Sequence, residues 1–248
     1  MITVTASDGT AEAWLARPVD EPTGPRPGVL LLMDAIGLRP RIHEMANRIA
    51  SWGYVVLAPN LFYREGTAAE TSPNGPLQTD EARAAFFTFA GPRVAGLTTD
   101  LAMPDLDSYL DALTSLAGVT TPVGIVGYCM GARHAVRAAC AHPGLVAAVG
   151  GFHGGAFVTD SVDSPHLGLP SATAEFVFGH ADNDRSMDPA AVDRLGAALA
   201  AAGLTASNEI YAGARHGYTM ADTTIFDEAA TERHFAELRA LFERTLTH

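Results

Sequence analysis

Runs of apolar residues alternate with amphipathic segments along most of the chain. Four runs of strand length are almost continuously apolar, at residues 28–33, 54–59, 123–128 and 145–150. Such runs are typical of strands buried on both faces of a parallel sheet. Between two of them, residues 40–52 place apolar side chains at helical spacing. Alternating strands and helices predict a mostly parallel sheet that is covered on both faces.

The complete pattern predicts eight strands. Residues 2–6 and 11–17 flank a turn signal and are expected to form an opening antiparallel hairpin. The other strands are expected at 28–33, 54–59, 123–128, 145–150, 174–178 and 208–211, and helices at 40–52, 80–89, 101–116, 132–140, 189–202 and 227–246. Residues 60–76 and 151–170 are expected to be loops. This order favours an α/β-hydrolase sheet in a single domain over residues 1–248.

The turn after the fifth predicted strand has the sequence Gly127-Tyr128-Cys129-Met130-Gly131. It matches the strand–turn–helix pattern that holds a nucleophile, with cysteine where serine is usual. The helix that follows would direct its first N–H groups toward the thiol and toward an oxyanion formed there. The alternative is a glycine-rich turn around a buried cysteine, since free cysteine is among the most buried residue types.

Two further strand ends carry candidate partners for Cys129. Asp182 follows the seventh predicted strand and His216 the eighth, so the chain order is nucleophile, acid, base. A thiol must become a thiolate to attack, and histidine exchanges protons near neutral pH. Asp182 is expected to hold the imidazole in one tautomer. Asp184 is a rival for this role, and His216 could instead be a surface histidine, one of nine in the chain.

Composition limits the partners that we expect. The net charge of −12 argues against nucleic acid and against an anionic membrane surface. Two cysteines are too few for a disulfide framework, and the N-terminus lacks a signal-peptide pattern, so we expect a cytoplasmic protein. The histidines lack metal-ligand spacing, and the acidic stretch from Asp182 has Met187 where a calcium loop needs glycine. We therefore expect no bound metal ion.

The chain resembles the dienelactone hydrolase family over nearly its whole length. The resemblance rests on the Cys129 motif, on Gly179-x-x-Asp182, on Tyr211-x-Gly-Ala-Arg-His216-Gly and on the segment 58–64. It implies a cofactor-free hydrolase that opens a lactone or ester through an acyl-thiolate intermediate. It also implies that the N–H groups of Ala35 and Met130 form the oxyanion hole.

The same resemblance raises two questions about individual side chains. The family usually has a glutamate near the nucleophile where this chain has Asp34, whose carboxylate is one methylene shorter. Family members that take dienelactone bind its carboxylate with arginines, and one of those positions is Met220 here. Loss of that arginine predicts a preference for neutral substrates. Arg83 is the loosely aligned second arginine, and Tyr63 and Tyr218 are further candidates for the pocket.

The expected function is therefore hydrolysis of a small lactone or ester by Cys129. A general carboxylesterase or thioesterase with the same three residues is an alternative, as is a ligand-binding protein that keeps the fold without activity. The expected partner is a small molecule, and we expect a monomer or a small homo-oligomer.

Overall fold

A twisted eight-stranded sheet forms the centre of the computed structural model, which describes residues 1–19 and 24–246. The strands lie in the order β1-β2-β4-β3-β5-β6-β7-β8. β1 and β2 are antiparallel to their neighbours, and the other strands run parallel. The strands are β1 (Ile2–Ala6), β2 (Gly9–Ala16), β3 (Arg26–Leu32), β4 (Val55–Pro59), β5 (Val119–Tyr128), β6 (Val146–Phe152), β7 (Glu175–Ala181) and β8 (Ala206–Tyr211). The predicted α/β sheet with an opening antiparallel hairpin is confirmed.

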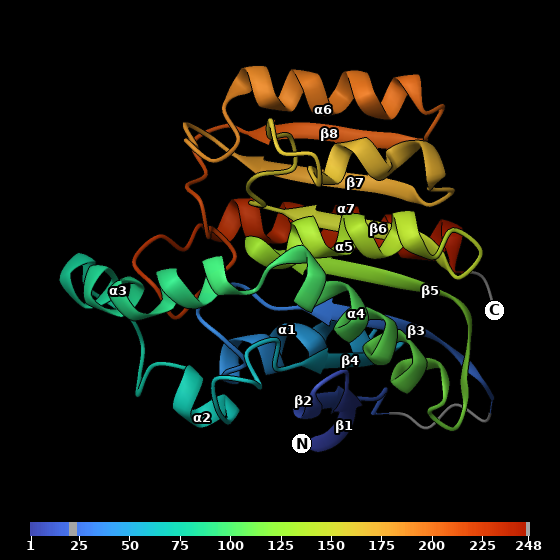
Figure 1. Ribbon diagram of the computed structural model, residues 1–248, viewed down its shortest axis with the longest axis horizontal. Coiled ribbons are helices and arrows are strands. Elements are labelled where there is room, and N and C mark those ends of the chain that lie inside the picture. Colours follow the sequence, from blue (N-terminus) through green and yellow to red (C-terminus); the bar gives the residue numbers. More distant parts are fainter. Residues whose placement is uncertain (20–23, 247–248) are drawn as a thin grey trace.

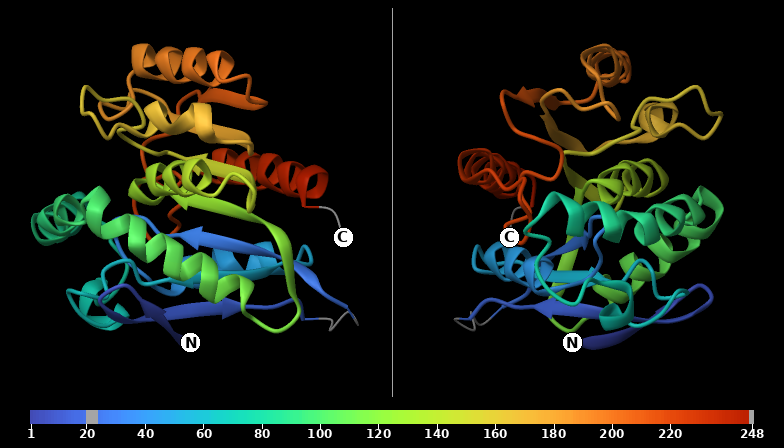
Figure 2. Two further views of the ribbon diagram at one scale, coloured as in Figure 1. Left: turned by 45° about the vertical axis from the view of Figure 1, so that its right-hand side comes forward. Right: turned by 90° about the vertical axis from the view of Figure 1, so that its left-hand side faces the viewer.

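Helices cover both faces of this sheet, which is why the central strands are apolar throughout. The helices are α1 (Pro40–Ala50), α2 (Ala68–Thr71), α3 (Asp80–Gly96), α4 (Thr99–Thr114), α5 (Met130–Ala141), α6 (Pro189–Ala201) and α7 (Glu228–Thr245), with a 3₁₀ helix at Pro165–Ser171. In Figure 2, α1 and α7 lie on one face, and α4 and α5 lie on the other. None of the described helices is long and apolar enough to cross a membrane.

The structure differs from the predicted pattern at several elements. β5 begins earlier than expected, at Val119, and its pairing with β6 shifts register between Val123 and Gly124. The segments expected to be loops contain α2 and the 3₁₀ helix. α2 is only one turn long and is fixed by a capping box between Thr67 and Glu70. Short polar turns of this kind lack the periodicity from which longer helices are predicted.

α3 continues through Pro92 to Gly96, whereas the sequence predicted its end near residue 89. Tertiary contacts offset the cost of an internal proline, because Arg93 donates a 2.6 Å hydrogen bond to the Thr71 carbonyl and Leu97 packs against the core. Figure 1 shows α3 projecting from the body of the molecule beside the carboxyl ends of the strands. Within this helix only Ala90 is buried. α3 therefore projects beside the carboxyl ends of the strands, where a parallel sheet usually binds its ligand.

Candidate active site

Cys129 occupies a strained turn between β5 and α5. Its backbone has φ 52° and ψ −115°, outside the regions that non-glycine residues usually adopt. A Cβ on Gly127 would lie 2.3 Å from the Gly131 carbonyl oxygen, and one on Gly131 would lie 2.3 Å from the Leu32 carbonyl oxygen. Only glycine fits at both positions, because strand and helix cross too closely for a side chain. The geometry matches the sharp strand-to-helix turn that the sequence predicted.

His216 lies between Cys129 and a carboxylate. Its Nε2 is 3.1 Å from the Sγ of Cys129, and its Nδ1 is 2.5 Å from the Oδ2 of Asp184. Asp184 also accepts hydrogen bonds from the N–H and the Oγ of Ser186, at 2.8 and 2.7 Å. Sulfur, imidazole and carboxylate thus form a continuous chain, the arrangement that activates a nucleophile.

The prediction that Asp182 contacts His216 is wrong. Asp182 accepts a 2.8 Å hydrogen bond from the Gly213 N–H, and its own N–H donates to the Ala214 carbonyl at 2.7 Å. It therefore ties the loop after β7 to the loop after β8. Asn183, between the two acids, adopts φ 53°, a left-handed conformation that asparagine tolerates well. This turn directs Asp184, the rival residue, toward the imidazole.

The charges of these three side chains favour a Cys129 thiolate beside a His216 imidazolium. Burial alone raises the pKa of Cys129, but the charge of His216 and its hydrogen bond lower that pKa below the usual value. Burial lowers the pKa of His216, but the Cys129 thiolate and the Asp184 carboxylate raise it to about 10. Burial likewise opposes ionisation of Asp184, yet His216 lowers its pKa to about 2. The second cysteine differs, since burial raises the pKa of Cys140 to about 11.

Ala35 and Met130, whose N–H groups the resemblance assigns to an oxyanion hole, both lie next to Cys129. The Ala35 N–H helps to lower the pKa of the Cys129 thiol, and Ala35 lines the same cavity as Cys129. Met130 is the first residue of α5, and the N–H groups of a first helical turn have no acceptor within the helix. Both N–H groups therefore belong to residues that border Cys129.

Asp34 forms an ion pair with Arg39, a residue that was not predicted to belong to the site. Arg39, only 4% exposed, contacts the two carboxylate oxygens of Asp34 at 2.6 and 3.2 Å. The same guanidinium contacts Asp222 at 2.5 and 3.1 Å and the Sδ of Met220 at 3.2 Å. Asp34 still raises the pKa of Cys129 through its charge. Asp34 is thus buried beside Cys129 and paired with Arg39.

Cys129 and His216 open into a cavity of about 260 Å³. Its walls contain both apolar and charged side chains. They are formed by Asp34, Ala35, Ile36, Arg83, Ala84, Phe87, Cys129, His153, His216, Gly217, Met220 and Ile225. Arg83 and Met220 are therefore placed as the sequence predicted, with Arg83 supplied by the projecting helix α3.

Two of the predicted pocket residues lie elsewhere. The Tyr218 hydroxyl donates to the Gly179 carbonyl at 3.1 Å, and its fully buried ring packs edge-on against His153, behind the cavity wall. The Tyr63 hydroxyl donates to Asp105 at 2.8 Å and accepts from the Asp8 N–H at 3.1 Å. It belongs to a polar cluster that joins the β1–β2 turn to α4. Both aromatic side chains are structural, and neither lines the cavity.

His153 is a wall residue that sequence reasoning missed. It is fully buried at the end of β6, with φ 37° and a 2.7 Å contact from Nε2 to the Thr219 Oγ1. Its Nδ1 has no hydrogen-bond partner among the described residues. Burial and the nearby positive charge of His216 lower the pKa of His153 well below its usual value. The signal in the sequence was its place directly after an apolar strand, at the functional edge of the sheet.

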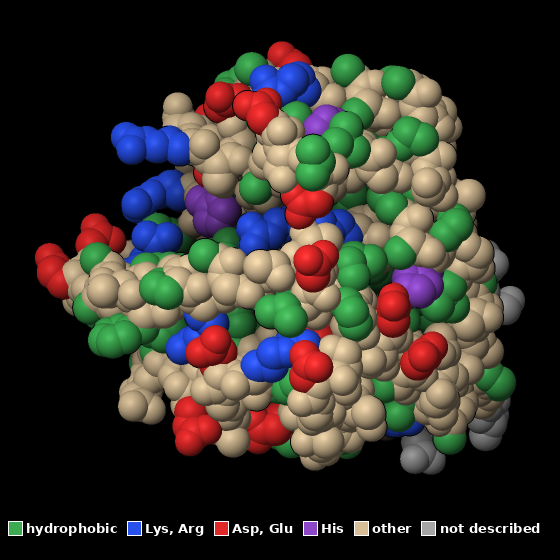
Figure 3. Space-filling model, viewed as in Figure 1, with side chains coloured by type: hydrophobic (Ala, Val, Ile, Leu, Met, Phe, Trp, Pro, Cys, Tyr) green, Lys and Arg blue, Asp and Glu red, His purple; other side chains and the backbone are tan. Residues whose placement is uncertain are grey.

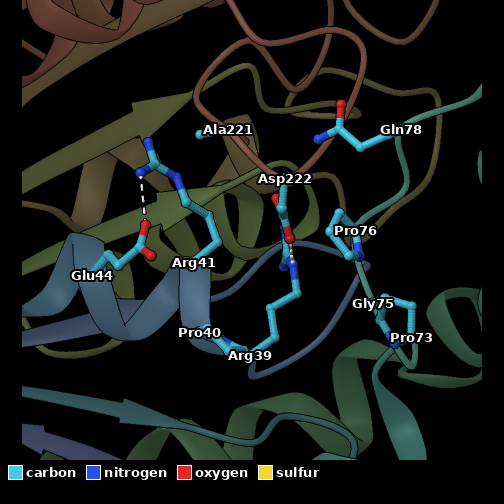
Figure 4. A pocket seen from close by; sticks show the side chains of 10 residues that line it. All are labelled: Arg39, Pro40, Arg41, Glu44, Pro73, Gly75, Pro76, Gln78, Ala221 and Asp222. Carbon is cyan, nitrogen blue, oxygen red and sulfur yellow. Dashed lines mark hydrogen bonds and ion pairs between the residues drawn. The ribbon is translucent and has the colours of Figure 1, made fainter.

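A larger cavity of about 440 Å³ adjoins the Arg39 cluster, as Figure 4 shows. Its charged side chains pair with one another within its walls: Arg39 with Asp222, and Arg41 with Glu44 at 3.2 Å. It contains neither Cys129 nor His216. Over residues 1–19 and 24–246, no group of three or more His, Cys, Asp and Glu side chains is arranged to hold a metal ion.

The chain is similar to known proteins in sequence and in fold. The chain is 28% identical over 228 residues to a carboxymethylenebutenolidase of Rhodococcus opacus, covering 91% of this chain and 84% of that one. It is 26% identical over 235 residues to a provisionally assigned carboxymethylenebutenolidase of Escherichia coli strain K12, covering 94% and 82%. The crystal structure of a provisionally assigned dienelactone hydrolase from Klebsiella pneumoniae superposes with a TM-score of 0.81 at 22% identity, covering 97% and 95%. The dienelactone hydrolase family profile matches residues 11–246, and the chain therefore belongs to the dienelactone hydrolase family.

Proposed function

We propose that this protein hydrolyses a carboxylic ester or lactone with Cys129 as the nucleophile. The proposal rests on one observation, the continuous contact from the Cys129 sulfur through His216 to Asp184. Membership of a hydrolase family supports it. So does the lowered pKa of the thiol, because the thiolate is the attacking species.

The reaction begins when the thiolate attacks the carbonyl carbon and a carbon–sulfur bond forms. The carbonyl electron pair moves to oxygen, and the N–H groups of Ala35 and Met130 stabilise the resulting oxyanion. As the carbonyl re-forms, the bond to the leaving oxygen breaks, and the His216 imidazolium gives that oxygen its proton. The product of this half is an acyl group on Cys129 and a neutral imidazole.

Water completes the cycle. Neutral His216 takes a proton from a water molecule, whose oxygen attacks the acyl carbon. The second oxyanion collapses, the carbon–sulfur bond breaks, and the thiolate is regenerated beside the imidazolium. Asp184 holds the imidazole in one orientation and stabilises its charged form in both halves. We assign it, in place of Asp182, as the acid of the triad.

The decisive experiment measures hydrolysis of p-nitrophenyl acetate by the wild type, by Cys129→Ala and by the matched control Cys140→Ala. Activity should disappear only in Cys129→Ala. Acid quenching during turnover, followed by peptide mass spectrometry, should find the acetyl group on the peptide with Cys129. Hydrolysis by Cys129→Ala at the wild-type rate would reject Cys129 as the nucleophile, and absence of hydrolysis by all three proteins would favour a binding protein.

A panel of lactones and matched open-chain esters separates the two enzymatic alternatives. A lactonase should give higher kcat/KM values for five- and six-membered lactones than for methyl esters of the same acyl chain. The reverse order would identify a carboxylesterase or thioesterase that uses the same residues.

A further inference from the structure

A second groove lies next to the cavity of Cys129. It has a volume of about 310 Å³ and shares Arg83, His216 and Ile225 with that cavity, whereas Cys129 itself does not line it. Its other walls come from residues 182–185, after β7, and from Arg215, after β8. A molecule bound at the thiol can therefore extend into this groove past His216.

Three arginines line this groove: Arg83, Arg185 and Arg215. Over the part of the chain that the structure describes, none of them pairs with a carboxylate within 4.0 Å. The Nε of Arg83 is also buried without a hydrogen-bond partner there. In a chain with a net charge of −12, these unpaired guanidinium groups form a local excess of positive charge. Figure 3 shows basic side chains gathered around a histidine on this face, next to α3.

Two carboxylates in the same groove offset part of this charge, but neither forms an ion pair with one of the three arginines. Asp184 is paired with His216, and Asp182 accepts the Gly213 N–H. A guanidinium binds phosphate and carboxylate oxygens in a bidentate manner, and several guanidinium groups together suit a multiply charged oxyanion better than a single carboxylate. The groove is therefore suited to a phosphate group.

The position of the groove beside His216 indicates which part of an ester substrate it would bind. The residue that protonates the leaving group is His216, so the leaving alcohol or thiol must lie on the His216 side of the carbonyl. Phe87, Met220 and Ile36 line the cavity of Cys129 but not the groove, so they are left for the acyl part.

We propose that the groove of Arg83, Arg185 and Arg215 binds the leaving group of an open-chain ester or thioester, and that this leaving group carries a phosphate. The inference rests on the proposed function, because it requires His216 to act at the leaving group. It favours open-chain substrates over lactones, since the leaving oxygen of a lactone remains attached to the acyl chain.

The test compares three acetate esters that differ at the para position of the leaving phenol: 4-acetoxyphenyl phosphate, 4-acetoxybenzoate and the neutral 4-acetoxyanisole. The kcat/KM ratio of each charged ester to the neutral one is measured for the wild type, Arg185→Gln, Arg215→Gln and the double variant. Comparing ratios between proteins cancels the intrinsic reactivity of each ester. Arg194→Gln is the matched control, since Arg194 is exposed on α6 and does not line the groove.

The phosphate ratio should fall roughly tenfold in each single variant and further in the double variant, where tenfold corresponds to about 1.4 kcal/mol. It should also fall with added salt, because exposed charges are screened. Arg194→Gln should leave the ratio unchanged, and the neutral ester should react equally well in all variants. Equal ratios in all five proteins would overturn the inference, and an equal preference for the carboxylate ester would overturn the assignment to phosphate.

Failure of the proposed function gives a different result. In that case the neutral ester is not hydrolysed, or Cys129→Ala hydrolyses it as fast as the wild type. Calorimetric titration with phenyl phosphate then tests the groove directly. Binding that weakens at least tenfold in the double variant supports an anion site, and absence of binding rejects it.

Discussion

Asp184, two residues beyond the acid expected from the sequence, lies 2.5 Å from the Nδ1 of His216. Asp182 instead accepts the Gly213 N–H at 2.8 Å. This difference separates the two acids by role, since one orients the imidazole and the other joins two loops.

Asp184→Asn should lower kcat by roughly 10³–10⁴-fold, because an amide supports the wrong imidazole tautomer and does not stabilise its charge. Asp182→Asn is the matched control. Its remaining side-chain oxygen still accepts the Gly213 N–H, so activity should stay within a few-fold of the wild type. Steady-state kinetics and circular dichroism on both proteins check this. A larger loss in Asp182→Asn would restore Asp182 as the orienting acid.

Iodoacetamide should label Cys129 much faster than Cys140 at pH 7. The pKa of Cys129 is lowered by His216, whereas burial raises the pKa of Cys140 to about 11. Peptide mass spectrometry at short times measures both rates, and activity should decline in step with labelling of Cys129. Equal labelling with activity retained would show that Cys129 is not the nucleophile.

The pH profile should have an alkaline limb near pH 10. In the proposed mechanism the reactive pair is a thiolate beside an imidazolium, and the pKa of His216 is raised to about 10. Asp184→Asn removes a negative charge that raises this pKa, so the limb should move to lower pH. The measurement is kcat/KM against pH for a neutral ester with both proteins. An unchanged limb would mean that it reports a group other than His216.

Gly131→Ala should cost roughly 2–3 kcal/mol of unfolding free energy, because the new Cβ would lie 2.3 Å from the Leu32 carbonyl oxygen. Gly144→Ala is the control, since a Cβ at that position would have no other atom within 4 Å. Urea unfolding compares the two variants. If both unfold at the same midpoint as the wild type, the approach of α5 to β3 is less constrained than its geometry implies.

The acyl cavity should prefer neutral acyl groups to acyl groups that carry a carboxylate. Met220 offers a thioether where the family resemblance implies an arginine, and the nearby Arg39 is already paired with Asp34 and Asp222. A buried charge-assisted hydrogen bond contributes about 1.5–3 kcal/mol, or roughly ten- to a hundredfold in kcat/KM.

A matched pair of substrates, one with a free acid in the acyl chain and one with its methyl ester, tests this preference. A clear preference for the free acid would contradict the prediction and point to Arg83, an arginine that lines the cavity. In that case Arg83→Gln should abolish the preference while leaving turnover of the methyl ester largely intact.

The order of the strands and helices, the turn at Cys129 and the position of His216 could all be predicted from the sequence alone. These features are local, because hydrophobic periodicity and glycine spacing act within a few residues of the chain. The same local signals did not predict α2, which depends on a capping box. They also did not predict the continuation of α3 beyond Pro92, which depends on contacts with distant residues.

Which side chains meet depends on the tertiary structure. The turn at Asn183 selects Asp184 over Asp182, and Arg39 reaches Asp222 across 183 residues of sequence. The groove of Arg83, Arg185 and Arg215 likewise combines α3 with the loops after β7 and β8. Contacts between residues so distant in sequence require several loops to follow particular paths. Each path depends on turns and packing that cannot be read from a local sequence pattern.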